Sequence, residues 1–132
     1  MCGRYYMDED VMNKIRELLK ETDTSCKLWM EKSAGDVHPS EKALVLTGKG
    51  PRLSAEWMQW GFPQKDGKGL LINARAETVS ERVTFRDSVL HRRCVVPARH
   101  YYEYGRTLSK VWRGRAVCHF DYPGQFIGFT GS

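Results

Sequence analysis

Long apolar runs are missing from this 132-residue sequence. A membrane-spanning helix needs about 20 consecutive apolar residues, and no stretch of the chain approaches that length. The pattern of a secretory signal peptide is missing too, because Asp8, Glu9 and Asp10 stand where its apolar core would lie. We therefore expect a cytoplasmic protein.

Closely spaced cysteines are also missing. The four cysteines are far apart and form no C-x-x-C pair: Cys2, Cys26, Cys94 and Cys118. This spacing argues against a zinc site, and a cytosolic chain is not expected to hold a disulfide framework. The four histidines match no metal-ligand spacing either: His38, His91, His100 and His119. The sequence therefore predicts no metal and no other cofactor.

Internal repeats and low-complexity linkers are absent, and 132 residues fit one domain with a core of its own. Hydrophobic residues at 41% and charged residues at 28% are typical of a soluble globular protein. The net charge of +5 is compatible with a polyanionic partner. Residues 86–115 hold eight of the basic residues against only Asp87 and Glu103. Arginine predominates there, which favours bidentate phosphate contacts, although a solvated basic face explains the segment equally well.

Hydrophobic periodicity predicts a mostly β chain with few helices, an α+β protein. Residues 8–21 have the spacing of an amphipathic helix with Asp8 as its N-cap. A shorter helix is predicted at 79–91, with Val83, Phe85, Val89 and Leu90 facing inward. Strands are predicted at 43–47, 52–60, 70–72, 93–104, 110–120 and 125–130, and an irregular connection at 22–42. Pro97 implies an edge, bulge or bend within its strand.

The chain begins Met1-Cys2-Gly3-Arg4. The initiator methionine is generally removed before a small residue, so we expect the mature chain to begin at Cys2. Its α-amino group and thiol, with ordinary pKa values of about 8 and about 8.5, are both partly deprotonated near neutral pH. Such an aminothiol condenses with an aldehyde to a Schiff base and closes to a stable thiazolidine ring. The alternative is an unremarkable small residue at a chain end.

Three further clusters can carry chemistry. Trp60 precedes Gly61-Phe62-Pro63 and can stack on a base, or it can be a core residue before a turn. Asn73 and Arg75 share one side of an extended segment, where they can hold a phosphate or sugar or form a structural pair. Glu103, between two tyrosines, is predicted to have a raised pKa suited to acid–base catalysis. It can also be an outward-facing strand residue.

Together these motifs resemble the SRAP (SOS response-associated peptidase) family. The resemblance rests on five ordered segments: Met1 to Tyr5, Trp60-Gly61-Phe62, Asn73 to Thr78, Phe85-Arg86, and Arg93 to Ala98 followed by Tyr102-Glu103-Tyr104. It also includes the segment Gly35 to Pro39. The family fold implied is a mostly antiparallel, curved and barrel-like β-sheet with a few flanking helices.

The resemblance implies an abasic-site sensor that binds single-stranded DNA and forms a thiazolidine DNA–protein crosslink. Cys2 would be the nucleophile and supply the amine, Asn73 would orient the lesion, and Glu103 would assist ring opening and proton transfer. The DNA-binding residues implied are Arg4, Trp60, Arg75 and Arg86. The peptidase label implies release of the amino-terminal residue with the help of Cys2 and Glu103. We expect a monomer with no membrane partner, located at the nucleoid if the source is bacterial.

The family pattern continues beyond Ser132 and includes a late catalytic histidine segment that this sequence does not contain. We therefore expect a truncated, N-terminal portion of one SRAP-like domain. A non-catalytic single-stranded DNA-binding remnant is the alternative function. A thiol peptidase acting on other proteins is a third possibility, and it ranks last because no histidine is a strong candidate base for Cys2.

Overall fold

The computed structural model describes residues 3–20, 34–104, 109–112, 125–126 and 128–130. These residues form the helices α1 (Glu9–Lys20) and α2 (Val83–His91). The strands before α2 are β1 (Tyr5–Met7), β2 (Gly35–Val37), β3 (Lys42–Lys49), β4 (Arg52–Trp60), β5 (Phe62–Pro63), β6 (Leu70–Leu71) and β7 (Asn73–Arg75). Those after it are β8 (Cys94–Val95), β9 (His100–Tyr104), β10 (Ser109–Trp112), β11 (Gln125–Phe126) and β12 (Gly128–Thr130).

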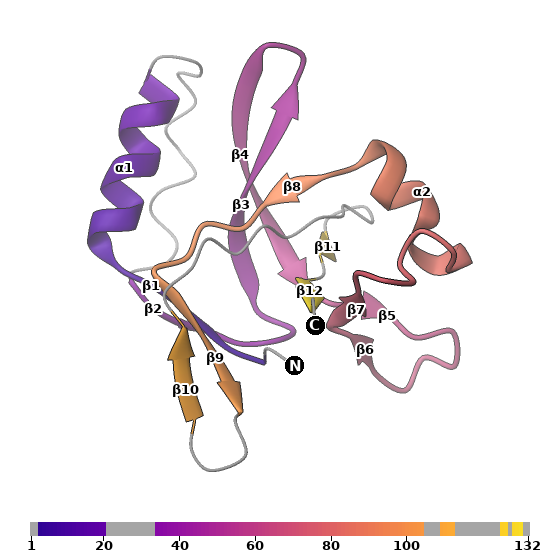
Figure 1. Cartoon of the computed structure of the whole chain (residues 1–132). Helices are drawn as coiled ribbons and strands as arrows, with labels where there is room; N and C mark the ends of the chain where they lie inside the picture. The colour runs from indigo at the N-terminus through magenta and orange to yellow at the C-terminus, as the bar shows by residue number, and fades with distance from the viewer. Residues whose placement is uncertain (1–2, 21–33, 105–108, 113–124, 127, 131–132) are drawn as a thin grey trace.

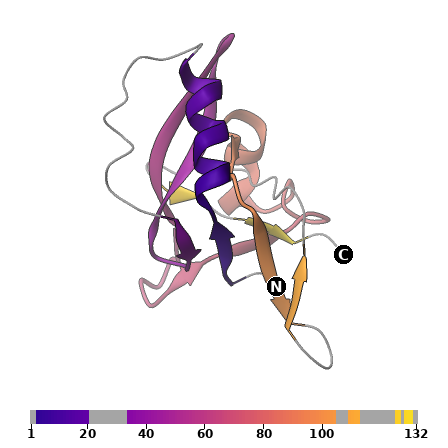
Figure 2. The same ribbon diagram turned by 90° about the vertical axis from the view of Figure 1, so that its left-hand side faces the viewer.

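Helix α1 begins where the sequence predicts it. The Asp8 carboxylate accepts a hydrogen bond from the Val11 backbone N–H at 2.9 Å, so Asp8 is the N-cap. Met12, Ile15 and Leu19 recur at helical spacing and are buried. Seen from the side in Figure 2, α1 lies across the β3–β4 hairpin. The helix therefore covers one side of the larger core.

The β3–β4 hairpin forms the centre of the molecule (Figure 1). Its antiparallel register runs from Lys42 opposite Gln59 to Lys49 opposite Arg52. Gly50 in the connecting turn has φ 62°, a left-handed conformation that glycine adopts without strain. β8 extends this sheet beside β3, and β11 lies parallel to β4. The larger core thus lies between α1 and the residues of β1 to β4 and β8.

A second sheet has the strand order β10-β9-β1-β2, with antiparallel pairing throughout. Tyr5 of β1 lies opposite Val37 of β2 on one side and Tyr101 of β9 on the other. Tyr5 and Met7 point into the larger core, whereas Tyr6 is only half-buried. The N-terminal strand is therefore an inner strand, held by backbone hydrogen bonds on both sides.

Residues 61–91 pack around a smaller core of Phe62, Ala74, Val79 and Phe85. The Phe62 and Phe85 ring centroids are 6.0 Å apart, so the β5–β6 hairpin is tied to α2. Figure 1 shows this unit on the side of the β3–β4 hairpin that is opposite to α1. Gly61 joins the two cores with φ 118°, and a Cβ there would meet the Leu70 side chain at 3.0 Å. Both observations require glycine at this position.

The predicted α+β class and mostly antiparallel pairing are confirmed. Several details differ. The described strands form separate sheets and do not close into a barrel. The predicted strand 93–104 is divided into β8 and β9 around Pro97, which has no N–H to donate. β2 lies in the segment that we expected to be irregular. Of the predicted strand 110–120, only the part within β10 lies among the described residues.

Helix α2 corrects the prediction of which residues face inward. Phe85 is buried and Val89 packs against the smaller core, as expected. Val83 and Leu90, however, are 87% and 60% exposed. At about 100° per residue, both lie far around the helix from Phe85, and Ser88 takes the buried position instead.

Candidate functional site

The strand β1 brings Arg4 beside β9. The Tyr102 backbone N–H donates to the Arg4 backbone carbonyl at 3.0 Å, which extends the β1–β9 pairing beyond Tyr5. Glu103 follows directly in β9, and its backbone pairs with Lys110 of β10. Cys2 lies outside the described residues. The backbone of Arg4 is therefore paired with the residue that directly precedes Glu103, a predicted catalytic residue.

Arg4, predicted to bind DNA, interacts closely with its own protein. Its guanidinium lies over the Tyr102 ring, 3.8 Å from the centroid. It also forms an ion pair with the Asp36 carboxylate at 3.5 Å. The Tyr102 hydroxyl donates to the same carboxylate at 3.2 Å. Asp36 thus joins the arginine and the tyrosine, and the positive charge of Arg4 is largely compensated.

The Tyr102 hydroxyl has a raised pKa. Partial burial is the main cause, the Asp36 carboxylate adds to it, and the Arg4 charge opposes it. The hydroxyl is therefore protonated at neutral pH and gives its one proton to Asp36. His100 Nε2 lies 3.3 Å from the same oxygen. The His100 ring also stacks on Tyr6, with centroids 5.0 Å apart and planes 17° apart. These side chains form a continuous polar and aromatic cluster across β2, β1 and β9.

Trp60 is a core residue in this structure. Its side chain is 3% exposed, and its indole N–H donates to the Ile72 backbone carbonyl at 2.9 Å. Its ring lies 5.5 Å from the Tyr5 ring, measured between centroids. A ring enclosed in this way offers no face to a base. This burial favours the alternative interpretation of Trp60, a core tryptophan before a turn.

Asn73 and Arg75 flank the buried Ala74 in β7. Because side chains alternate along a strand, Asn73 and Arg75 share the side away from the smaller core. Asn73 is half-buried and Arg75 is exposed. β7 pairs in parallel with β12, where Asn73 lies opposite Gly128. The shared side expected for these two residues is thus present, and Ile72 connects it to the indole of Trp60.

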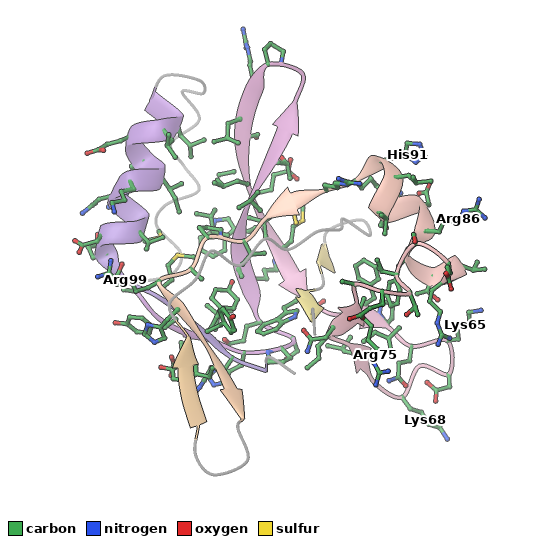
Figure 3. All side chains as sticks on the ribbon, in the orientation of Figure 1. Lys65, Lys68, Arg75, Arg86, His91 and Arg99 are labelled. Atoms are coloured by element: carbon green, nitrogen blue, oxygen red, sulfur yellow. The ribbon has the colours of Figure 1, made fainter. Side chains whose placement is uncertain are left out.

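Arg86 lies on the exposed side of α2. Figure 3 shows it on the same flank of the molecule as Lys65, Lys68 and Arg75. We call these four cations the basic face. None of the four forms an ion pair with another residue in the part of the chain that the structure describes. Arg99, on the opposite flank in Figure 3, is paired with Asp8 at 3.4 Å.

The sequence did not single out Asp36, His100 or Lys65 and Lys68 as parts of a site. Asp36 is 66 residues away from Tyr102 in the chain, so only the strand register brings the two together. The motif Gly35 to Pro39 was a usable signal, because it belongs to the family pattern. Lys65 and Lys68 occupy the β5–β6 connection, which carries no pattern beyond that of a polar turn.

Across the described ranges, no three or more His, Cys, Asp or Glu side chains gather closely enough to hold a metal ion. Neither α1 nor α2 has the length and apolar character needed to cross a membrane. Cys94 is a buried free thiol in β8, whereas Cys26 and Cys118 lie outside the described residues.

Comparison with known proteins identifies the family. Residues 1–121 match the family model for SOS response associated peptidase (SRAP). Two Bacillus subtilis (strain 168) proteins, the abasic site processing proteins YoaM and YoqW, are 30% identical over 119 residues and 31% over 116 residues. Each alignment covers 84% of this chain, but 50% of YoaM and 51% of YoqW. The chain thus spans about half the length of the curated relatives it matches.

A solved structure supports the fold. The chain superposes on a phage-related protein of Bordetella bronchiseptica with a TM-score of 0.66, covering 98% of this chain and 69% of that one. The sequence identity is 15%, so this likeness concerns the fold alone. The family match over most of the chain confirms the resemblance that the motifs indicated: the chain belongs to the SRAP family.

Proposed function

We propose that this protein processes abasic sites in single-stranded DNA by forming a covalent crosslink through Cys2. The observation that carries the proposal is the hydrogen bond from Tyr102 N–H to the Arg4 carbonyl. It ties the chain two residues after Cys2 to the strand residue next to Glu103. The curated relatives are named abasic site processing proteins, which supports an abasic site as the lesion.

The chemistry needs no oxidant or reductant. Hydrolysis of the Met1–Cys2 peptide bond consumes one water and frees the Cys2 α-amino group. This amine attacks the aldehyde carbon of the ring-opened abasic sugar, and loss of one water forms a C=N bond. The Cys2 sulfur then adds to the imine carbon while its proton passes to the nitrogen, which closes the thiazolidine ring. Release of Met1 is the autoproteolytic, peptidase-type part of the proposal.

Glu103 is the proposed acid–base group, because ring opening, water loss and sulfur addition each require a proton transfer. Asn73 is proposed to orient the abasic sugar with its amide. Arg4 is proposed to contact a phosphate beside the lesion, which requires it to exchange the Asp36 carboxylate for that phosphate. Trp60 has no DNA contact in this proposal, because its ring is buried.

Arg75 and Arg86 are the proposed phosphate contacts on the basic face. Both are exposed, and an arginine that gives up no protein carboxylate binds a phosphate without the loss of an existing ion pair. Neutralised phosphates release condensed cations, so binding should weaken steeply as salt increases.

Incubation with a single-stranded oligonucleotide that holds one abasic site tests the proposal. We expect a slower-migrating species that survives heating on a denaturing gel. Cys2→Ser is the matched variant, since it keeps the α-amino group and a hydroxyl but loses the sulfur. It should give a Schiff base that borohydride traps, without the heat-stable product. Absence of a product with the wild-type chain, or a heat-stable product with Cys2→Ser, would contradict the proposal.

A second function is favoured by the basic face alone. Four cations without a described acidic partner can bind single strands even without any chemistry at Cys2. A non-catalytic protein of this kind would show salt-dependent binding and no adduct. The gel experiment and a binding titration on the same sample separate the two functions.

A further inference from the structure

The buried side chain of Trp60 connects β1 with the residue that precedes β7. Trp60 contacts Tyr5 of β1 through its ring, at 5.5 Å between centroids. Its indole N–H reaches the Ile72 carbonyl at 2.9 Å, and Asn73 is the next residue. Trp60 therefore lies between β1 and the residue that precedes β7.

Trp60 is itself held from several directions. Its backbone N–H donates to the Glu41 carbonyl at 3.0 Å, and its carbonyl accepts from the Ser40 N–H at 2.9 Å. The next residue, Gly61, takes the left-handed φ of 118° that turns the chain into the smaller core. With its backbone fixed and its ring 3% exposed, the indole has little freedom to move. It is a rigid spacer between β1 and β7.

We infer that Trp60 is a positioning residue for the proposed reaction, because it fixes the separation between the N-terminal strand and Asn73. The inference rests on the proposed function. The contact on the β7 side is a hydrogen bond from the indole N–H to the Ile72 carbonyl. A displacement of about 1 Å in a reacting assembly can lower a rate by as much as about 100-fold. Loss of this N–H should therefore slow crosslinking even where DNA binding is intact.

Trp60→Phe tests the inference, because phenylalanine keeps an aromatic ring against Tyr5 and removes the donor. Two quantities are measured on the full 132-residue chain. The first is the dissociation constant for an oligonucleotide with a tetrahydrofuran abasic analogue, which has no aldehyde. The second is the single-turnover rate of adduct formation at saturating abasic DNA. We expect an unchanged dissociation constant and a rate at least about tenfold lower.

Val45→Ala is the control for lost stability, because Val45 is fully buried in the larger core and its side chain can form no hydrogen bond. Both variants are compared at temperatures equally far below their midpoints of unfolding. A readout that needs no reaction is the pair of Asn73 side-chain amide signals in a ¹⁵N–¹H spectrum. These signals should move in Trp60→Phe and stay in place in Val45→Ala.

The outcomes are distinct. Equal slowing in Trp60→Phe and Val45→Ala would overturn the inference in favour of a purely stabilising role. Equal losses of rate and DNA affinity in Trp60→Phe would overturn it in favour of a direct DNA contact. A wild-type rate with unmoved Asn73 signals would show that the hydrogen bond positions nothing. A wild-type chain that forms no adduct overturns the proposed function, while the Asn73 signals still decide whether Trp60 fixes β7.

Discussion

Arg4 and Arg75 were both expected to bind DNA, yet they lie in opposite electrostatic surroundings. In the sheet β2-β1-β9, Arg4 lies on Tyr102 and pairs with Asp36, and nearby Arg99 pairs with Asp8. On the basic face, Arg75, Arg86, Lys65 and Lys68 have no ion pair with the described residues. Arg4 and Arg99 are thus each paired with a carboxylate, whereas the cations of the basic face have no described carboxylate partner.

From this difference we infer that the two regions have different roles. Compensated charges hold groups in place and suit a site where an amine, a thiol and a carboxylate must meet. Uncompensated charges suit the attraction of a polyanion from solution. The count of basic residues along the chain cannot distinguish the two, because it does not show which cations are already paired.

The largest expected effect is on the rate of adduct formation, after a substitution in β9. Glu103→Gln removes the proposed acid–base group while it keeps the size of the side chain. Adduct formation should slow by about 100-fold, the low end for loss of a general acid or base. Binding of the tetrahydrofuran oligonucleotide should be unchanged. A comparable loss of binding would place Glu103 in the DNA interface. It would contradict the proposal that the sheet region carries the chemistry and the basic face binds the DNA.

The next effect belongs to the basic face. Arg75→Gln and Arg86→Gln should each weaken binding of single-stranded DNA and lower the slope of log K against log salt by about 0.7. The adduct rate at saturating DNA should stay the same. Lys14→Gln, an exposed position on α1, is the matched control and should leave the slope unchanged. Equal slopes for all three variants would show that the basic face does not contact phosphates.

A smaller effect is expected when Arg4 loses its acidic partner, because its surroundings then become more like those of the basic face. Asp36→Asn removes the carboxylate that pairs with Arg4. Exposed ion pairs contribute about 0–1 kcal/mol, so DNA affinity should rise by up to about fivefold. Glu17→Gln on α1 changes the net charge equally and is the control. A fall in affinity would mean that Asp36 holds Arg4 in its binding position instead of competing with phosphate.

The smallest effect concerns the pH dependence of stability. The pKa of Tyr102 is raised in the folded protein by partial burial and by the Asp36 carboxylate. Stability from this group is therefore fully present below the unfolded tyrosine pKa of about 10 and is lost as pH rises through the higher folded pKa. Between pH 9 and 11, the unfolding midpoint should fall more steeply in the wild type than in Tyr102→Phe. Parallel curves would contradict the raised pKa.

Local patterns predicted much of the fold. Helix α1 and its Asp8 cap follow from periodicity and capping chemistry, and β4 occupies the predicted residues 52–60. Long-range register was not predictable. The Asp36–Tyr102 contact and the place of β2 depend on which strands become neighbours, and a single sequence does not specify this.

The candidate site was predicted in part. The motif order gave the family, and the strand alternation placed Asn73 and Arg75 on one side of β7. The sequence neighbours of Trp60 fit both a base-stacking residue and a core residue, and the burial of its side chain favours the core residue. The contact with Tyr5, which lies far from it in the chain, is what makes Trp60 part of the core.

The intact mass of the product formed with abasic single-stranded DNA tests the central claim most directly. The proposal predicts a species equal to the chain without Met1 plus the oligonucleotide, less one water, with the linkage mapped to Cys2. The same sample without DNA should show the free chain lacking Met1. A covalent product in which Met1 is retained, or one linked through any other residue, would contradict the proposal.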